Sequence, residues 1–127
     1  MWQLYQTETS ADVKRAVINA LFIGGAADRL AELAQKETDP RLRREAIERL
    51  GLTGPKSAPT LRTIYTSDKD PAVRKAVLNA LFIQGNASML VEIARAEQDP
   101  ALKRAAVEKL ALMRSQEATD YMLELLK

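Results

Sequence analysis

Apolar residues recur along the chain with the spacing of a helix face, and the same spacing occurs four times. The second, third and fourth positions of each set follow the first by four, five and eight residues, which places all four on one side of an α-helix. The sets are Val13, Val17, Ile18 and Leu21; Leu42, Ala46, Ile47 and Leu50; Val73, Val77, Leu78 and Leu81; and Leu102, Ala106, Val107 and Leu110. The pattern predicts four amphipathic helices.

A second apolar set follows each of these helices after a short stretch of turn residues. We expect second helices to begin near Ala26, Ser57, Asn86 and Ser115. Their core positions are Ala27, Leu30, Leu33 and Ala34; Ala58, Leu61, Ile64 and Tyr65; Ala87, Leu90, Ile93 and Ala94; and, with one residue inserted, Ala118, Met122, Leu125 and Leu126. The chain is therefore predicted to be a row of helix–turn–helix units.

Residues typical of helix ends mark the same boundaries. Ser10-Ala11, Asp39-Pro40, Asp70-Pro71 and Asp99-Pro100 precede the four first helices. A Ser or Asp side chain accepts a hydrogen bond from a free backbone N–H at the helix start, and Pro needs no N–H partner there. We expect the first helices to end near Gly24-Gly25, Gly51 to Gly54, Gly85 and Met113, since glycine readily takes the left-handed conformation after a helix.

The chain also repeats itself at a longer interval. Residues 13–40 and 73–100 are identical at 16 of 28 positions without a gap. Each hairpin is too small to bury its own apolar face, so neighbouring hairpins must stack. This predicts an all-α solenoid in one domain over residues 1–127, with units 10–38, 39–69, 70–98 and 99–127. Residues 1–9 align with the end of the second unit, so we expect a partial N-terminal repeat and a chain that is a piece of a longer protein.

Odd and even units differ at two positions. One position reads Phe22, Gly51, Phe82 and Ala111 in the four units, and the position two residues earlier reads Ala20, Arg49, Ala80 and Lys109. A large residue thus alternates with a small one, which predicts that large side chains pack against small ones in neighbouring units.

The amino-acid composition of the chain argues against several kinds of partner and reaction. Nineteen Lys and Arg against 17 Asp and Glu leave a net charge of +2, too small to indicate nucleic acid or an anionic membrane as partner. Neither Cys nor His is present, so thiolate metal sites, disulfides and the commonest general base near neutral pH are excluded. No apolar run approaches the roughly 18 residues that cross a bilayer. We expect no cofactor, no metal, no small-molecule substrate and no catalytic residue.

The segments DPRLRREAIERL, DPAVRKAVLNAL and DPALKRAAVEKL resemble short bacterial HEAT repeats, also called HEAT-like or lyase-type repeats. The shared pattern is Asp-Pro, an aliphatic residue, a basic residue and an Ala-rich helix. The resemblance covers nearly the whole chain. It implies a right-handed α-α superhelix of about four hairpins, with the first helices on the convex side and the second helices on a concave side that faces a protein or peptide partner.

Two cations open every predicted first helix, where positive charge opposes the helix macrodipole. The first cation of each pair is Lys14, Arg43, Arg74 or Lys103. We expect these to pair with Asp39, Asp70 or Asp99 of an adjacent unit in a structural ladder. The alternative is a track for nucleic-acid phosphates, which is disfavoured because acidic residues share the expected partner-facing side and no aromatic residues lie between the cations.

Two columns of side chains are expected on the concave face. One contains Arg29, Thr60, Met89 and Tyr121, and the other contains Glu32, Thr63, Glu92 and Glu124. Paired carboxylates can carry acid–base chemistry, but Thr63 interrupts the second column and nothing apolar encloses it. We therefore interpret both columns as candidate partner-binding residues.

The two ends of the array carry apolar residues that a further unit would cover. Trp2, Leu4 and Tyr5 lie at one end, and Leu123, Leu125 and Leu126 at the other. These favour either more repeats or end-to-end self-association. Taken together, the sequence predicts a non-catalytic protein-interaction scaffold. The alternatives are a nucleic-acid-binding solenoid and an accessory module of a larger enzyme.

Overall fold

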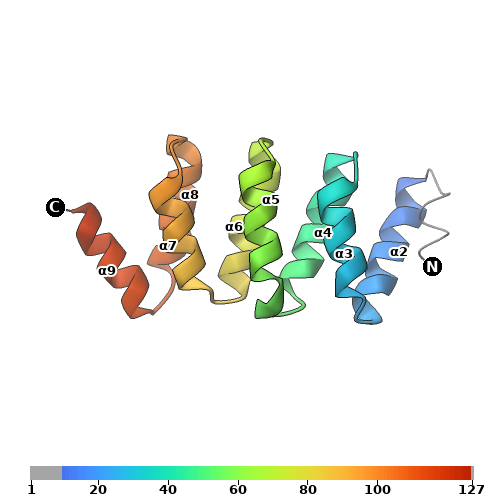
Figure 1. Cartoon of the computed structure of the whole chain (residues 1–127), viewed down its shortest axis with the longest axis horizontal. Helices are drawn as coiled ribbons and strands as arrows, with labels where there is room; N and C mark the ends of the chain where they lie inside the picture. Colours follow the sequence, from blue (N-terminus) through green and yellow to red (C-terminus); the bar gives the residue numbers. More distant parts are fainter. Residues whose placement is uncertain (1–9, 127) are drawn as a thin grey trace.

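The computed structural model describes residues 10–126, apart from the side chains of Ala11 and Pro55, and this part of the chain contains α-helices, one short 3₁₀-helix and no strand (Figure 1). The α-helices are α2 (Ala11–Ile23), α3 (Ala27–Lys36), α4 (Pro40–Gly51), α5 (Ala58–Ser67), α6 (Pro71–Ile83), α7 (Ala87–Ala96), α8 (Pro100–Ala111) and α9 (Gln116–Leu125); the 3₁₀-helix η1 is Pro55–Ser57. The expected partial repeat at residues 1–9 lies outside the described residues.

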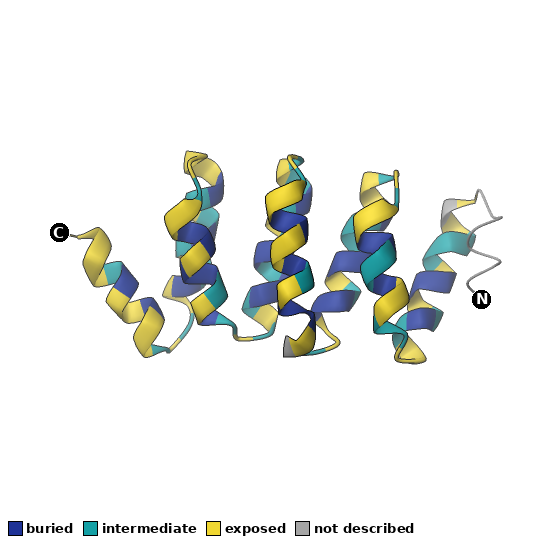
Figure 2. Cartoon of the chain, in the orientation of Figure 1, coloured by how far each residue is buried: buried dark blue, intermediate teal, exposed yellow. Residues whose placement is uncertain are grey.

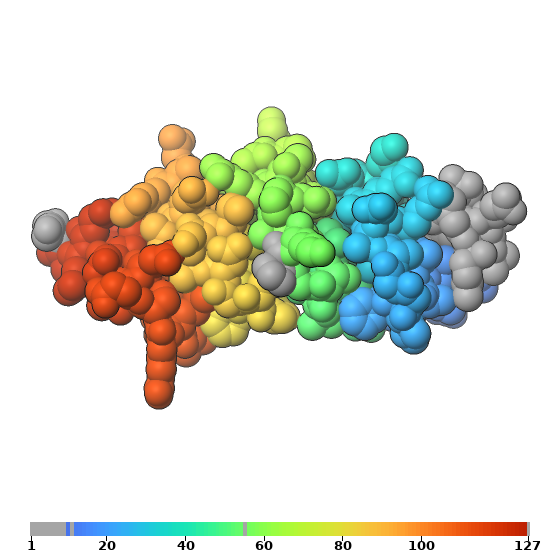
Figure 3. Space-filling view, turned by 60° about the horizontal axis from the view of Figure 1, so that its bottom comes forward, coloured from blue at the N-terminus to red at the C-terminus, as the bar shows by residue number. Residues whose placement is uncertain are grey.

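The helices pair into four hairpins that stand side by side in a row (Figure 1). The first helices α2, α4, α6 and α8 form one layer and contact one another in succession. The second helices α3, α5, α7 and α9 form the other layer and contact one another less than the first helices do. The space-filling view shows one elongated body in which successive units are adjacent (Figure 3). The predicted all-α solenoid is confirmed.

The core is a continuous apolar strip between the two layers (Figure 2). Alanines at its centre, such as Ala34, Ala46, Ala94 and Ala106, are fully buried. Their small side chains let neighbouring helices approach while leucines and isoleucines fill the remaining space. Because successive hairpins add to the same strip, each hairpin is stabilised by its neighbours.

The helix ends form as the residues there predict. Asp39, Asp70 and Asp99 accept hydrogen bonds from the backbone N–H two residues later, each at 2.9 Å. Ser10 makes no such side-chain bond, so the first unit lacks this cap. Gly25 and Gly85 adopt positive φ angles of 73° and 69°, which a residue with a Cβ rarely does, and turn the chain into the second helix.

One predicted set of core positions is wrong. In α9 the buried residues are Ala118 and Tyr121, with Tyr121 only 2 % exposed, whereas Met122 is half-buried and Leu125 and Leu126 are exposed. The three-residue spacing of Ala118 and Tyr121 equals that of Ala87 and Leu90, so no inserted residue is needed. Tyr121 takes a core position, and the leucines extend past the last packed turn. The end-to-end contact expected from these leucines stays a prediction, and its counterpart Trp2, Leu4 and Tyr5 lies outside residues 10–126.

The alternation between odd and even units has a physical basis in two contacts. The Arg49 guanidinium lies 5.7 Å from the centre of the Phe22 ring, and the Lys109 ammonium lies 5.3 Å from that of Phe82. Each phenylalanine is thus covered by a cation of the following unit. Gly51 does not receive a large residue as expected but lies against Ala80 of the third unit, and a Cβ on Gly51 would be 2.6 Å from the Ala80 Cβ.

A side-chain amide secures the same junction between the second and third units. Gln84 Nε2 donates to the carbonyls of Gly51 and Gly54, at 3.2 and 2.7 Å, and to Ser57 Oγ at 2.7 Å. Ser57 is the one buried polar residue among those described, and its hydroxyl also lies 3.1 Å from the Leu50 carbonyl. The duplicated sequence has Gly24 in place of Gln84, so this bond distinguishes the central junction.

We predict that Gly51→Ala lowers the free energy of unfolding by about 1–3 kcal/mol, because the added methyl group overlaps Ala80. Urea denaturation followed by circular dichroism measures the change. The matched control is Ala111→Leu, at the equivalent exposed position of the last unit, which should shift stability by less than about 0.5 kcal/mol. Combining Gly51→Ala with Ala80→Gly should recover part of the loss, and additive effects would contradict this account.

Candidate functional site

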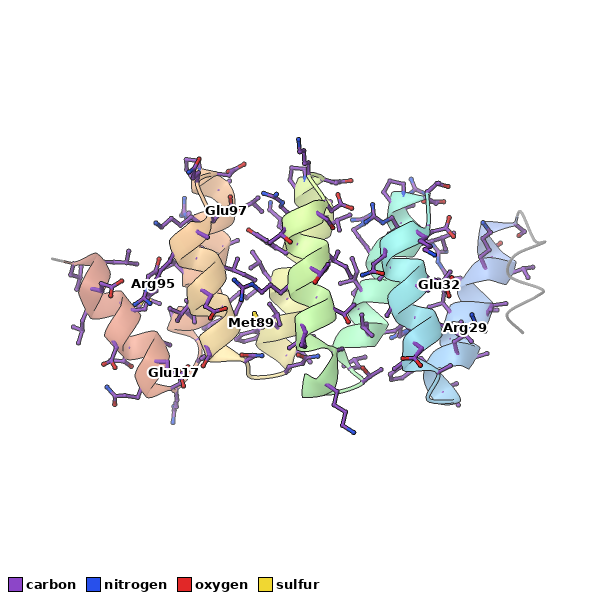
Figure 4. All side chains as sticks on the ribbon, in the orientation of Figure 1. Arg29, Glu32, Met89, Arg95, Glu97 and Glu117 are labelled. Carbon is purple, nitrogen blue, oxygen red and sulfur yellow. The ribbon has the colours of Figure 1, made fainter. Side chains whose placement is uncertain are left out.

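The exposed and half-buried side chains of the second helices form one face of the array, here called the second-helix surface (Figure 4). Arg29, Glu32 and Lys36 come from α3, and Arg62, Thr63 and Thr66 from α5. Ser88, Glu92 and Arg95 come from α7, and Glu117, Asp120 and Glu124 from α9. They share one face because i, i+3 and i+4 positions of a helix point the same way.

Ion pairs and a hydrogen bond connect successive second helices across this surface. Arg62 of α5 lies 2.6 Å from Glu92 of α7, and Arg95 of α7 binds both carboxylate oxygens of Glu124 of α9, at 3.1 and 2.8 Å. The Ser88 hydroxyl donates to Glu117 of α9. Since both partners of each exposed ion pair lie in water, the pairs orient side chains more than they stabilise the fold.

The four residues of the first column expected for partner binding differ in how far their side chains are exposed. Arg29 is exposed and pairs with Glu32 at 3.3 Å on the same helix. Thr60 is half-buried, and Met89 is half-buried and packs against the core. Tyr121 is buried, so it cannot act as an exposed contact, and this part of the prediction is corrected. The Arg95 guanidinium lies 5.5 Å from the centre of the Tyr121 ring, and the Tyr121 hydroxyl is buried without a hydrogen-bond partner among the described residues.

The second expected column lies at the surface but is not a set of free carboxylates. Glu32 pairs with Arg29 and with Lys36 of α3, and Glu92 and Glu124 pair with arginines of the preceding second helix. Thr63 is exposed, and its hydroxyl donates to the Pro59 carbonyl at 3.0 Å.

Arg62, Arg95 and Glu117 were not among the residues predicted for the site. Their interactions join residues 29 or 30 positions apart. A search for opposite charges separated by one repeat length would have found the two ion pairs, because equivalent positions of stacked units lie next to each other.

Two adjoining hollows open between the second helices. A hollow of about 200 Å³ separates α5 from α7 and is lined by Arg62, Tyr65, Thr66, Arg74, Glu92, Ile93, Ala96 and Glu97. A second of about 300 Å³ separates α7 from α9 and is lined by Ser88, Val91, Glu92, Arg95, Glu117 and Asp120. Glu92 lines both hollows. They exist because the second helices contact one another less closely than the first helices.

A buried polar cluster forms one wall of the first hollow. The Tyr65 hydroxyl donates to Glu97, and the Arg74 guanidinium lies 5.1 Å from the centre of the Tyr65 ring. Arg74 also lies 3.5 Å from Glu97 and donates through Nε to the Asp68 carbonyl at 2.7 Å. Burial, and secondarily the Glu97 carboxylate, raise the pKa of Tyr65 well above its usual range. Tyr65 therefore stays neutral and serves as a hydrogen-bond donor.

The predicted ladder of cations exists, but its acidic partners differ from those expected. Lys14 pairs with Glu37 at 3.7 Å, Arg43 pairs with Asp68, and Arg74 pairs with Glu97. The partners Asp39, Asp70 and Asp99 expected for these cations instead accept backbone N–H groups as helix caps.

Each observed acid follows the second helix of the cation's own unit and also accepts the N–H of the capping aspartate. Lys103 of the last unit forms no ion pair among the described residues. The ladder therefore closes the first three hairpins at the ends of their two helices.

A family model for HEAT repeats matches residues 27–89, from α3 to the first turn of α7. The match falls on the stacked hairpins at the centre of the array. The chain is a HEAT-like repeat protein. No curated protein is significantly similar to it. HEAT repeats generally mediate protein–protein interactions and are typically non-catalytic.

The described part of this HEAT-like repeat protein contains no group of three or more carboxylates placed to hold a metal ion. None of the helices described is both long and apolar enough to cross a membrane.

We predict that Arg74→Ala lowers the free energy of unfolding by about 1–3 kcal/mol, because it removes the cation beside Glu97 and leaves the Asp68 carbonyl without its side-chain donor. Arg104→Ala, which removes an exposed pair with Glu108 at 3.0 Å, is the control and should cost less than about 0.5 kcal/mol. Urea unfolding measures both. Equal losses for the two variants would show that the buried cluster contributes no more than a surface ion pair.

The raised pKa of Tyr65 predicts a loss of stability at alkaline pH. Below the pKa of about 10 that a tyrosine has in the unfolded chain, Tyr65 makes the same contribution to the free energy of unfolding at every pH. Above that pKa the unfolded state loses a proton that the folded state keeps, so the free energy of unfolding falls. Between pH 9 and pH 11 the wild type should therefore lose about 1 kcal/mol more than Tyr65→Phe. Denaturation of both proteins at the two pH values tests this, since lysine ionisation affects both alike. Parallel losses would contradict it.

Proposed function

We propose that this HEAT-like repeat protein is a non-catalytic scaffold that binds a protein or peptide segment along its second-helix surface. The observation that carries the proposal is the pair of adjoining hollows between α5, α7 and α9. A segment laid across the second helices would place successive side chains in the two hollows, with Ile93 and Ala96 supplying apolar contact in the first. Arg29, Glu32, Thr60 and Thr63 extend the surface toward the first unit.

The ion pairs between second helices support rapid and specific binding. Arg62 and Arg95 are already oriented by Glu92 and Glu124 in the free protein. Less side-chain freedom is then lost when a partner binds, which raises affinity for a given contact area. Met89 and Tyr121 support this surface from below instead of contacting the partner.

The charges around α9 indicate the kind of segment. Glu92, Glu117 and Asp120 line the second hollow together with Arg95, which pairs with Glu124, so that acids outnumber cations among the described residues here. Complementary charge across an interface steers association and selects partners. The proposed partner therefore carries Lys or Arg where it meets α7 and α9.

Site-specific photo-cross-linking tests the proposal. A photoreactive residue in place of Thr63, exposed on α5, should capture a partner, whereas the same residue at Gln98, exposed in the loop before α8, should not. The captured protein is identified by mass spectrometry, purified and titrated by calorimetry. Asp120→Lys should weaken its binding at least about tenfold, through like-charge repulsion.

Asp12→Lys is the matched control, because Asp12 is an exposed acid on α2, far along the chain from α9. It should leave the affinity unchanged. Equal capture at positions 63 and 98, or equal affinities of the two variants, would contradict binding at the second-helix surface.

A further inference from the structure

One large aliphatic residue per unit is exposed where the first helix ends. These residues, here called the aliphatic row, are Ile23, Leu52, Ile83 and Leu112. Each follows the first core position of its unit by ten residues, and their exposed fractions range from 48 % to 83 %. Because they occupy equivalent positions, they follow one another along the edge of the array where first helices turn into second helices, the lower edge in Figure 1.

The side chains of the aliphatic row take no part in the hydrogen bonds that close the hairpins, although the backbone N–H groups of Leu52 and Leu112 cap α4 and α8. The turns after α2 and α6 are closed by backbone bonds from Ala26 N–H to Leu21 O, at 2.9 Å, and from Asn86 N–H to Leu81 O, at 3.0 Å. Neither bond involves a residue of the row. A single exposed apolar residue is normal on a protein surface, whereas large contiguous apolar patches mark interaction sites. An exposed Ile or Leu at the same position of all four units therefore points to a binding surface.

A row of cations runs parallel to the aliphatic row on the first helices. This basic row is Arg15, Arg44, Lys75 and Arg104. The outer two are paired, Arg15 with Glu45 at 2.6 Å and Arg104 with Glu108 at 3.0 Å. The central two, Arg44 and Lys75, form no ion pair with any residue in the described part of the chain. Arg44 Nε is moreover buried without a hydrogen-bond partner in residues 10–126.

A hollow of about 490 Å³ connects the two rows over α6. The small side chains of Ala72, Ala76 and Ala105 line it, and Ala76 stands where α4 carries Glu45. Polar residues complete the lining, among them Glu48, Glu108 and Lys109. Arg44 and Lys75 lie on its border toward the helix starts, and Leu112 lies on its border toward the helix ends. The alanines at the base of the hollow therefore belong to one continuous surface with the unpaired cations Arg44 and Lys75 and the exposed Leu112.

The dimensions of this surface match an α-helix laid across the first helices. The two rows are eight residues apart on each helix, which corresponds to about 12 Å, and an α-helix with side chains is about 10–12 Å wide. Neighbouring first helices are separated by about 8–10 Å, and seven residues of an α-helix rise about 10.5 Å. A helix crossing α4, α6 and α8 would therefore meet Leu52, Ile83 and Leu112 with every seventh residue.

We propose that the first-helix face is a second binding surface, which takes an acidic amphipathic α-helix of a partner protein. Leucine-like residues of that helix pack on the aliphatic row and the alanine floor, and its acidic edge pairs with Arg44 and Lys75. Nucleic acid fits this face less well, since the aliphatic row offers phosphates no contact. Glu45 and Glu108, which lie among the cations, are already paired with Arg15 and Arg104. The surface lies on the layer opposite the second-helix surface, so the two proposals succeed or fail separately.

Fluorescence anisotropy with a designed peptide tests the inference. The probe is a labelled helical peptide of about three heptads with leucine at every seventh position and glutamate along the adjacent edge. It should bind the wild type, and Ile83→Ser with Leu112→Ser should weaken binding at least about tenfold. Arg44→Glu with Lys75→Glu should have a similar effect that shrinks as salt is raised.

Two controls test whether peptide binding depends on the first-helix face. Arg62→Glu, on the second-helix surface, should leave peptide affinity unchanged. A peptide of the same composition with leucines distributed around the helix should not bind. All substituted residues are exposed or half-buried at the surface, and circular dichroism confirms that each variant is folded before it is titrated.

Three results would overturn the inference. The first is absence of peptide binding to the folded wild type, or equal binding of both peptides. The second is binding of duplex DNA or phosphatidylglycerol vesicles through Arg44 and Lys75 that the peptide does not displace, which would assign the face to a different class of ligand. The third is a dimer in sedimentation that Ile83→Ser with Leu112→Ser abolishes, which would assign the aliphatic row to a second copy of the chain.

Discussion

Every feature of this protein depends on the inability of a single hairpin to bury its own apolar face. Two short helices leave one side of their shared stripe in water, so each hairpin is stabilised only by packing against the next. The core that results has no centre and runs as a strip between the layers of first and second helices. A protein built this way gains solvent-exposed surface with every added repeat, and this surface is available for binding.

The central junction shows how closely this packing is specified. Because Gly51 has no side chain, α4 can approach Ala80 of α6. At the same turn the Gln84 amide donates hydrogen bonds to the carbonyls of Gly51 and Gly54 and to the Ser57 hydroxyl. At the junctions on either side of it, Arg49 and Lys109 cover phenylalanine rings. The units are therefore not interchangeable, because small residues favour one kind of contact and cation–aromatic pairs another.

The two layers differ in what they offer a partner. Second helices are the less closely packed layer, and the hollows between them are bordered by Arg and Glu side chains that already hold one another in place. First helices are closely packed, and their outer face carries parallel rows of cations and aliphatic residues. Repetition converts a single exposed position into a row, which is how a solenoid obtains a long binding surface from a short unit.

The sequence by itself determined the helices, their caps and most of the core. Periodic apolar positions, Asp-Pro starts and glycine stops are local signals, and their physical causes act within one hairpin. It also determined that the hairpins stack, because the repeated pattern leaves an apolar face on each. Residues such as Ala46, Leu50, Leu61 and Leu90 were correctly predicted to be buried on this basis alone.

Only the tertiary structure decided which charged groups meet and which residues of α9 are buried. Arg43 and Arg74 pair with Asp68 and Glu97 because the end of a second helix lies beside the start of its own first helix. In α9 the sequence is compatible with two sets of core positions, and packing against α7 and α8 buries the set that contains Tyr121 and not Met122. Ion pairs, and the choice between two possible faces of a terminal helix, depend on contacts between segments far apart in sequence, which local periodicity does not encode.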